Sequence, residues 1–295
     1  MYVRPVFIFS LLVTGHFSFG QFEYPALSPL GKITQVVGNT TIQIEYERPA
    51  VRGRKIFGGL VPWNKTWRTG AGYCTKISFD QTVQVNNQRI EAGTYSLFTI
   101  PNPEEWVIML NSDTTLYGSG FYDQQRDIAR FIAKPQSTSR YYESFTIDID
   151  IIPNNARVYL SWDNVQVSFC VQTTTDRIVT QFIEQNLMTG TSKNSREYEG
   201  ATDYLFYQNA NYSDALQLAE MGLKLDTTLS YLRRVKMEIY EKLRMHHQAL
   251  EEAQKGIGFP KQRKYEREEQ REKDLLWWQN HIDRIEGKMK NIPEQ

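Results

Sequence analysis

The chain has 295 residues, a length that suits two domains better than one. Its 34 Lys and Arg residues balance its 34 Asp and Glu residues, so it lacks the broad positive charge of nucleic-acid-binding proteins, and we expect no nucleic acid as a partner. A hydrophobic content of 40% argues against disorder, and two cysteines are too few for a zinc ribbon or a disulfide-rich scaffold.

The first twenty residues have the pattern of a secretory signal peptide. Arg4 precedes an apolar run at residues 6–13. The small residues Ser18 and Gly20 then stand at positions −3 and −1 of the cleavage site expected before Gln21. The run is too short to span about 30 Å of hydrocarbon, and no later segment approaches that length. We therefore expect residues 1–20 to be a signal peptide. The mature protein should then be exported, periplasmic or secreted, and not membrane-spanning.

Residues 21–175 alternate between apolar and polar side chains. The alternation is clear in residues 41–47, 145–151 and 158–162, and residues 83–90 have the form of two strands joined by a tight turn. One-sided alternation over many short strands indicates antiparallel sheets with one buried face. We therefore predict that residues 21–175 form an all-β antiparallel sandwich-like domain.

Cys74 and Cys170 both lie in this β half. Strand parity places each of them on the polar face of its strand, opposite the residues expected in the core. An exported chain can form a disulfide, but only where the two strands bring the sulfur atoms together. The sequence leaves a disulfide and two free thiols equally open.

The segment 48–72 is the most unusual part of the β half. It begins RPAVRGRKIFGGLVPW and continues with WRTGA from residue 67. Together with AGTYSLFTIP at 92–101 and WVIMLN at 106–111, it resembles the bacterial family called domain of unknown function 2911. The resemblance spans about residues 28–173. It implies an exported protein of the Bacteroidetes type, often with a tetratricopeptide tail, and it implies no activity because the family has no established one.

Cations and tryptophans are concentrated in that segment. Guanidinium groups suit carboxylates or phosphates, and flat aromatic faces suit sugars. The segment therefore predicts a binding site for an anionic glycan or a small acid. Alternatively, the tryptophans plug the end of the sandwich and the arginines bond loop carbonyls. The candidate ligand-binding residues are Arg48, Arg52, Arg54, Trp63, Trp67 and Arg68.

After residue 175 the apolar spacing changes to about 3.6 residues, which indicates helices. Residues 176–195 are predicted to form a connecting helix, capped by Asp176 and ended by Gly190, followed by a polar linker. Residues 196–295 contain an internal repeat with an offset of 34 residues. The recurring small residues are Ala215 with Ala249, Ala219 with Ala253, and Gly222 with Gly256.

This repeat resembles the tetratricopeptide repeat, whose unit is a pair of helices spanning 34 residues. Asp203 and Met237 stand where that family has a small residue, which puts the helix spacing in question. A last helix with Trp278 and Ile282 is expected to cap the stack. The resemblance implies a groove for a protein or peptide partner. The candidate partner-binding residues are Tyr204, Tyr207, Tyr212 and Tyr231.

Few residues suit catalysis or metal binding. The β half contains no histidine, and the three histidines beyond the signal peptide lie in the helical half, so triads and histidine-ligated metals are not expected in the β domain. The carboxylate pairs Glu45/Glu47 and Asp148/Asp150 lie on the solvent side of their strands. Asp123 is the better single acid, without a visible partner. We predict no catalytic residue, no metal and no cofactor.

The sequence therefore predicts a multidomain protein, an all-β antiparallel sandwich-like domain followed by an all-α tetratricopeptide-like repeat. The leading function is that of an exported, non-catalytic binding or scaffolding protein of the cell envelope, acting through the helical repeats. The alternative is that the β domain binds an anionic glycan or small acid. A hydrolase that uses Asp123 or one of the carboxylate pairs ranks third. It ranks below the other two because no base with an orienting partner is visible. The ligand, the partner and the oligomeric state stay open.

Overall fold

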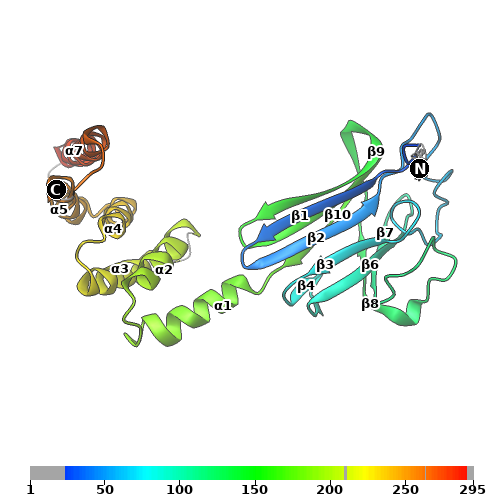
Figure 1. Ribbon diagram of the computed structural model, residues 1–295, viewed down its shortest axis with the longest axis horizontal. Helices are drawn as coiled ribbons and strands as arrows, with labels where there is room; N and C mark the ends of the chain where they lie inside the picture. The colour runs from blue at the N-terminus through cyan, green and yellow to red at the C-terminus, as the bar shows by residue number, and fades with distance from the viewer. Residues whose placement is uncertain (1–23, 209–210, 263, 291–295) are drawn as a thin grey trace, which may run out of the picture.

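A computed structural model of the chain describes residues 24–208, 211–262 and 264–290. A β domain lies at one end and a helical tail at the other, and helix α1 (Thr175–Phe182) runs between them (Figure 1). The predicted order of an antiparallel β domain and a helical tail is therefore confirmed. The predicted signal peptide, residues 1–20, lies outside the described residues.

The larger sheet of the β domain has six antiparallel strands in the order β1-β2-β3-β6-β7-β8. Neighbouring strands along the chain mostly pair with each other, so this sheet is built largely from hairpins. The strands are β1 (Leu30–Val37), β2 (Thr40–Glu47), β3 (Thr75–Phe79), β6 (Gly93–Ile100), β7 (Trp106–Asn111) and β8 (Asp127–Ala133).

The second sheet has four antiparallel strands in the order β5-β4-β10-β9. Its short hairpin turns at Asn86 and Asn87, whose φ angles of 48° and 64° are those of a tight left-handed turn. The predicted strand pair at residues 83–90 is thereby confirmed. The strands are β4 (Val83–Val85), β5 (Gln88–Ile90), β9 (Gln136–Ile152) and β10 (Asn155–Gln172).

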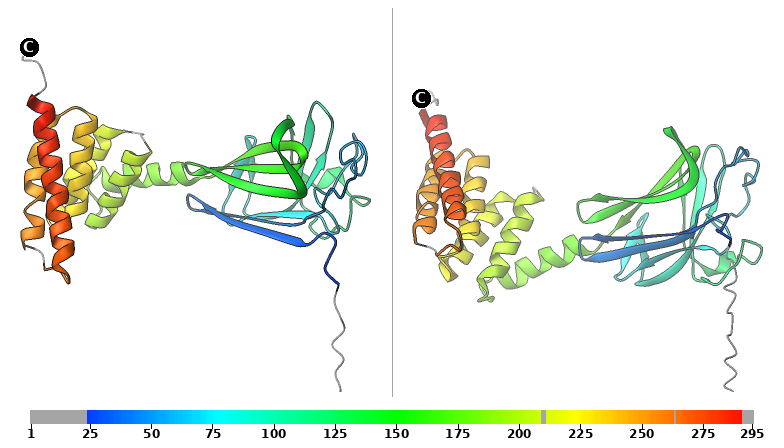
Figure 2. Two further views of the ribbon diagram at one scale, coloured as in Figure 1. Left: turned by 90° about the horizontal axis from the view of Figure 1, so that it is seen from above. Right: turned by 45° about the horizontal axis from the view of Figure 1, so that its top comes forward.

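The two sheets pack face to face over one continuous apolar core, as the layered view in Figure 2 shows. In β2 the residues at positions 42, 44 and 46 are buried while those between them are half-buried. Ile147 and Leu160 extend the same core from the other sheet. The period-two pattern of the sequence thus forms a sandwich because each sheet has only one apolar face to bury.

The helical tail contains two antiparallel helix pairs and a long final helix. A π-helical turn, η2 (Ile183–Leu187), continues α1 before the polar linker. Asp176 was predicted to cap α1, which was wrong: Thr174 occupies the N-cap and Asp176 lies in the first turn. The remaining helices are α2 (Ser195–Tyr207), α3 (Tyr212–Leu225), α4 (Ser230–Lys242), α5 (His246–Gly256), α6 (Phe259–Gln262) and α7 (Glu268–Lys290).

The residues that repeat at 34-residue intervals form the helix contacts. Ala215 and Ala219 of α3 are fully buried, and so are their counterparts Ala249 and Ala253 of α5. Small side chains at these positions let the paired helices approach closely. The repeat in the sequence is therefore a repeat of packing.

Gly256 of α5 is expected to be essential for the packing of α7 against α5. A Cβ atom built there would lie 2.4 Å from the Trp278 ring, so Gly256→Val should destabilise the tail by about 1–3 kcal/mol through overpacking. Hydrogen exchange of the α5 and α7 amides measures the loss. Gly287→Ala is the matched control, because nothing lies within 4 Å of its Cβ position. Equal protection in Gly256→Val and Gly287→Ala would contradict this packing.

Hydrogen bonds join the β domain to the helices at the turn between β9 and β10. The Asn154 side-chain amide donates to Asp176 Oδ1 at 2.6 Å, and the Tyr204 hydroxyl donates to the same oxygen. On the other sheet, the Asn39 backbone N–H donates to Thr175 Oγ1 at 2.9 Å. The opposite end of the sandwich, which lies far from the helices and carries segment 48–72, makes none of these contacts (Figure 1). We call it the loop end.

Both cysteines are free thiols: Cys74 directly precedes β3 of the larger sheet, and Cys170 lies on β10 of the other. Cys74 was expected on a polar face, but it is buried in a second apolar cluster with Phe98 and Met109. Strand parity predicted correctly that Cys74 faces away from the core between the two sheets. It did not predict that Leu116 and Tyr122, in the segment that follows β7, pack over that outer face.

The two thiols should react at different rates. Burial raises the pKa of the Cys74 thiol, which lowers the fraction of reactive thiolate. Cys170 is half-buried and its Sγ accepts from Arg157 Nη2 at 3.8 Å. A thiol reagent should therefore label Cys170 first in the native protein, as peptide mapping would show. Preferential labelling of Cys74 would contradict its placement.

Candidate functional site

The segment 48–72 closes the loop end of the sandwich around Phe57. The Phe57 ring lies 5.0 Å from the ring of Trp106 and 6.2 Å from that of Trp67. Trp67 also stacks on Trp162 at 5.7 Å, so the segment contacts the strands of both sheets. The long connection is therefore a packed structure with a fixed shape, held by aromatic side chains.

The backbone of this segment adopts conformations that side chains disfavour. Arg52 and the β-branched Thr69 have φ angles of 49° and 54°, in the left-handed region. Thr69 is held there by Thr75, whose hydroxyl donates to the Thr69 carbonyl at 2.5 Å. The Trp67 indole N–H donates to the Gly70 carbonyl at 3.0 Å. Strained backbone held by tertiary contacts is typical of functional sites.

A cavity of about 420 Å³ opens beside this segment. Four cationic side chains line it, and no carboxylate belongs to the described residues of its wall. Trp67 and Trp162 form its aromatic part. Its cationic residues are Arg52, Arg54, Lys65 and Arg68.

Two of these arginines are tied to the backbone. Arg52 Nη2 donates to the Leu27 carbonyl at 2.7 Å, and Arg54 donates to the carbonyls of Ala50 and Val51 at 2.5 and 3.0 Å. These bonds hold the guanidinium groups in place without neutralising their charge. The predicted alternative, arginines that bond loop carbonyls, is thus part of the same arrangement.

Arg68 is the arginine of this wall that has no partner among the described residues. Within the described parts of the chain its guanidinium makes no hydrogen bond or ion pair, and its Nε is a buried donor. Trp162 also lines the cavity, and its indole Nε1 is a buried donor without a partner among the described residues. Unsatisfied buried donors are costly and rare, so the two donors on residues of this wall mark it as the candidate binding site.

The structure brings four of the six predicted ligand-binding residues to the cavity, namely Arg52, Arg54, Trp67 and Arg68. Arg48 lies elsewhere and bonds the Phe145 carbonyl and the Thr146 hydroxyl at 3.2 and 3.0 Å. Trp63 stacks on Phe57 at 5.9 Å instead.

Other wall residues were not predicted. Trp162 comes from β10 and Ser119 from the connection after β7, so each is distant in sequence from segment 48–72. Trp162 stood in an alternating strand pattern, which signals core and not a cavity wall. Lys65 lies within the segment, but a lone lysine between two tryptophans gave no distinct signal.

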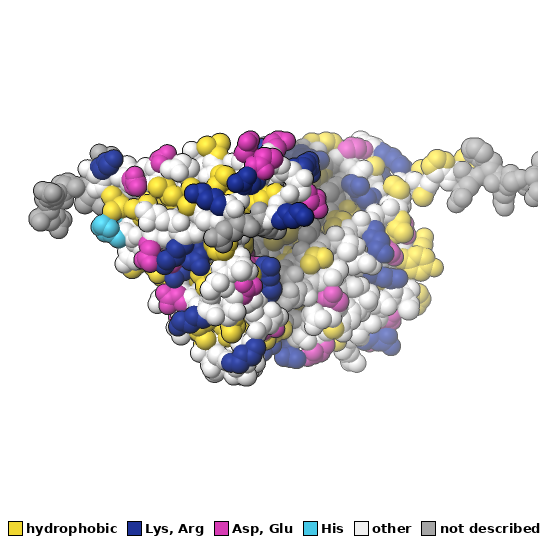
Figure 3. Space-filling model, turned by 60° about the vertical axis from the view of Figure 1, so that its left-hand side comes forward, with side chains coloured by type: hydrophobic (Ala, Val, Ile, Leu, Met, Phe, Trp, Pro, Cys, Tyr) yellow, Lys and Arg dark blue, Asp and Glu magenta, His cyan; other side chains and the backbone are white. Residues whose placement is uncertain are grey.

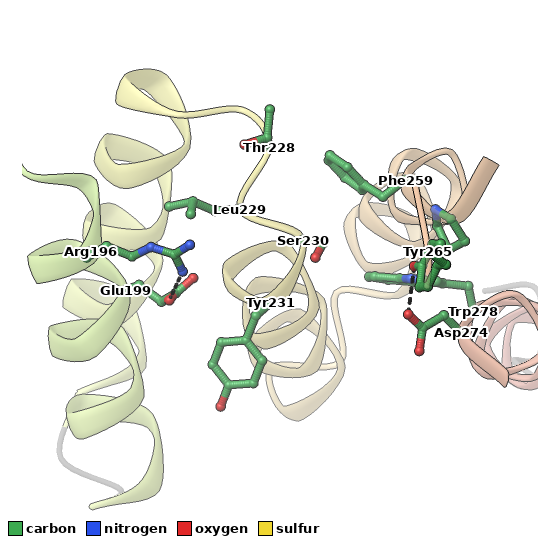
Figure 4. A pocket seen from close by; sticks show the side chains of 11 residues that line it. Arg196, Glu199, Thr228, Leu229, Ser230, Tyr231, Phe259, Tyr265, Asp274 and Trp278 are labelled. Carbon is green, nitrogen blue, oxygen red and sulfur yellow. Dashed lines mark hydrogen bonds and ion pairs between the residues drawn. The ribbon is translucent and has the colours of Figure 1, made fainter. Parts of the chain in front are cut away.

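The helical tail contains a second, larger cavity of about 730 Å³, drawn in Figure 4. It lies between α2, α4 and the segment of α6 and α7. Arg196 pairs with Glu199 at 2.7 Å on the α2 side, while Asp274 accepts from the Tyr265 hydroxyl at 2.7 Å on the α7 side. Tyr231 lies on α4 between these two sides (Figure 4). The wall combines aromatic, acidic and basic side chains.

The four predicted partner-binding tyrosines do not form one surface. Tyr231 lines the 730 Å³ cavity, and burial together with the Tyr207 hydroxyl raises the pKa of its hydroxyl. Tyr204 instead bonds Asp176 at the junction with the β domain. Tyr212 packs at 6.1 Å from the Phe206 ring. Of the four, only Tyr231 lines the helical cavity, and Tyr207 contacts its hydroxyl.

Positively and negatively charged side chains are mixed on the surface of the helical tail. Figure 3 shows Lys and Arg side chains interspersed with Asp and Glu side chains over this end. Several of them form ion pairs, such as Glu241 with both Arg284 and Lys288. On the face that Figure 3 shows, positive side chains thus lie beside negative ones, unlike the wall of the β-domain cavity.

The candidate catalytic groups remain apart from both cavities. The Asp123 carboxylate accepts from the Gln125 backbone N–H at 2.9 Å and so caps the short helix η1 (Gln124–Arg126). Glu47 Oε1 accepts from the Tyr73 backbone N–H at 3.2 Å. In the parts of the chain that the structure describes, no group of three or more His, Cys, Asp or Glu side chains is placed to share a metal ion.

Comparison with known proteins assigns the β domain but no activity. A search among curated proteins found no match for the chain. None of the described helices is long and apolar enough to cross a membrane. Residues 28–171 match the family model described as Protein of unknown function (DUF2911), as the sequence had suggested. The β domain of this chain, with its cation-lined cavity, belongs to that family.

Proposed function

We propose that this protein is an exported, non-catalytic binding protein whose β domain holds an anionic ligand in the 420 Å³ cavity. The observation that carries the proposal is the wall itself, with four cations, no carboxylate among its described residues, and an arginine without a partner. Arg68 is only partly exposed, unlike Arg52, Arg54 and Lys65, so its uncompensated charge carries a desolvation cost that a bound anion offsets.

The chemistry of the wall favours a carboxylate or phosphate group. A guanidinium group offers parallel N–H donors that match two oxygens of either anion. Arg68 is placed to provide such a fork, because none of its donors is bound within the described chain. Trp162 adds an indole donor, which suits an oxygen of the same ligand or of a neighbouring hydroxyl. A phosphorylated or acidic sugar combines these features.

Calorimetric titration of the chain from Gln21 onward tests the proposal. The probes are glycerol phosphate and glucuronate, with glycerol and glucose as their uncharged counterparts. We expect the anions to bind and the uncharged probes to bind far more weakly, with an affinity that falls as salt screens the charges. Equal affinity for charged and uncharged probes, or none for either, would contradict the proposal.

A second function is favoured by the 730 Å³ cavity of the helical tail. We propose that the tail, as a tetratricopeptide-like repeat, docks a segment of a partner protein in the groove of α2, α4 and α7. The cavity provides aromatic surface from Tyr231 and Trp278 beside charged groups, the combination by which helical repeats hold peptides. This was the leading function predicted from the resemblance to the repeat.

The variant Tyr231→Ala should lose such a partner. Its ring is partly exposed at the cavity, so truncation removes contact area without opening the core. Chemical crosslinking in envelope extracts, read by mass spectrometry, compares it with the wild type. Tyr141→Ala, at an exposed tyrosine of the β domain, is the control. A partner captured equally by all three proteins would show that the groove is not its site.

A further inference from the structure

Exposed apolar side chains lie at the β-domain cavity and on the segments beside it. Leu27 and Leu60 line the cavity itself. Ser119 also lines it, and the two neighbouring rings, Tyr117 and Phe121, lie two residues to either side of that serine. We call this set the apolar rim. Its members and their exposed fractions are Leu27 73%, Leu60 46%, Tyr73 58%, Tyr117 70% and Phe121 85%.

The apolar rim is fixed to the cavity wall by backbone hydrogen bonds. The Gly118 N–H donates to the Gly72 carbonyl at 2.9 Å, which joins the two segments that carry Tyr117 and Tyr73. Their rings contact each other at 5.2 Å. Cys74 N–H donates to the Leu116 carbonyl at 2.9 Å beside them. The exposed aromatic rings therefore belong to an ordered structure around the cavity.

Positive charge accompanies the apolar rim. The cavity contributes its four cations, and the exposed Lys55 adds another from the same segment. Two carboxylates lie nearby and keep their charge, but both are held by neutral donors: Glu143 accepts from the Arg52 backbone N–H at 2.9 Å and from the Tyr141 hydroxyl at 3.1 Å. Glu47 accepts from the Tyr73 backbone. The loop end of the sandwich thus combines protruding apolar groups with a cavity whose described wall carries four cations and no carboxylate.

Such a combination fits the surface of an anionic bilayer. Apolar and aromatic side chains enter the boundary between headgroups and acyl chains, while cations attract the lipid phosphates. A glycan fits less well, because Leu27 and Leu60 offer it no flat face and the Tyr73 and Tyr117 rings meet at 88°, edge to face. The loop end also points away from the helical tail (Figures 1 and 2), so a surface there does not collide with the tail.

We infer that the apolar rim docks on a bilayer rich in anionic phospholipid, with one headgroup phosphate in the cavity. This inference rests on the proposed anion-binding function and names the source of the anion. Arg68 would hold the phosphate, and Phe121 and Leu60 would lie among the lipid headgroups. The helical tail would then extend from the membrane surface and remain free for its partner.

Vesicle co-sedimentation tests the inference. The chain from Gln21 onward is used, so that the apolar run at residues 6–13 contributes nothing. It should sediment with vesicles of phosphatidylcholine mixed with phosphatidylglycerol and stay in solution with phosphatidylcholine alone. Phe121→Ser should weaken partitioning at least about tenfold, since it removes one inserted aromatic side chain. Arg68→Gln should weaken it as well.

Ile151→Ser is the matched control. Ile151 is half-exposed at the other end of the β domain, close to the turn that contacts the helices. Its substitution should leave partitioning unchanged. Equal partitioning of the wild type and Phe121→Ser, or a loss in Ile151→Ser alone, would overturn the assignment of the surface. Partitioning that survives Arg68→Gln would overturn the placement of the phosphate.

Titration of the same proteins with glycerol phosphate separates the two proposals. Phe121→Ser should bind it as the wild type does, because Phe121 does not line the cavity. If glycerol phosphate binds and vesicles do not, the lipid surface is wrong and the anion-binding function stands. If neither binds, both proposals fail. An acidic glycan that binds more tightly than the vesicles would overturn the lipid as the source of the anion.

Discussion

The variant Arg68→Gln is expected to lose the anion while it keeps its fold. The Arg68 guanidinium makes no hydrogen bond within the described chain, so its removal costs the folded state little. A hydrogen bond to a charged group contributes about 1.5–3 kcal/mol, which corresponds to a loss of about 10- to 100-fold in affinity. Titration with glycerol phosphate measures this loss directly.

Lys55→Gln provides the control for charge alone. Lys55 is an exposed cation in the same segment, but it does not line the cavity. Its loss lowers the net charge by the same amount as Arg68→Gln, and the affinity should fall only slightly because exposed charges are screened. Similar losses in both variants would show that the anion is attracted by general charge and not held by Arg68.

The variant Phe57→Ala is expected to cause the largest loss of stability. Phe57 contacts four tryptophan rings and is almost fully buried. Truncation of such a phenylalanine costs about 3–5 kcal/mol, from lost transfer free energy and the resulting cavity. It also releases the segment that carries Arg52 and Arg68, so anion affinity should fall with stability. Hydrogen exchange of the β2 and β7 amides in increasing urea measures the change.

Phe121→Ala is the matched substitution of an exposed phenylalanine. Its ring is in solvent, so stability should change by no more than about 0.5 kcal/mol. If Phe57→Ala were as stable as Phe121→Ala, the segment 48–72 would not be packed as described. The pair thus separates the structural role of the aromatic cluster from the surface role of the apolar rim.

The alternation of side chains predicted the β domain well because it records burial directly. In β2 every second residue is buried, as residues 41–47 had indicated. The same reasoning failed for Cys74, because parity says which face a residue occupies and not what covers that face. The cover comes from Leu116 and Tyr122, which lie in a connection without periodicity. Sequence patterns predict faces, whereas long connections that fold over them leave no such pattern.

The cavity was partly predictable for a similar reason. Arg52, Arg54, Trp67 and Arg68 lie in one unusual segment, so composition alone indicated a shared site. Arg48 was grouped with them, yet it follows β2 directly and bonds strand β9 of the other sheet. Whether an arginine bonds a carbonyl or faces a cavity depends on contacts between distant segments, which one sequence does not encode locally.

The helical tail was also predictable only in part. The 34-residue offset predicted the buried alanines, because close packing requires small residues at fixed spacing. The tyrosines were less predictable, since a partly exposed aromatic residue suits a groove, a junction or a packing contact equally. Tyr204 bonds Asp176 at the junction, whereas Tyr231 lines the helical cavity.

Nuclear magnetic resonance can show whether an anion binds inside the β-domain cavity. The indole N–H of Trp162 and the Nε–H of Arg68 are buried donors without partners at that cavity. Addition of glycerol phosphate should shift both signals in a saturable manner, while the indole signal of Trp277 on α7 stays in place. Unchanged Trp162 and Arg68 signals at saturating anion, or equal shifts at Trp277, would contradict the account.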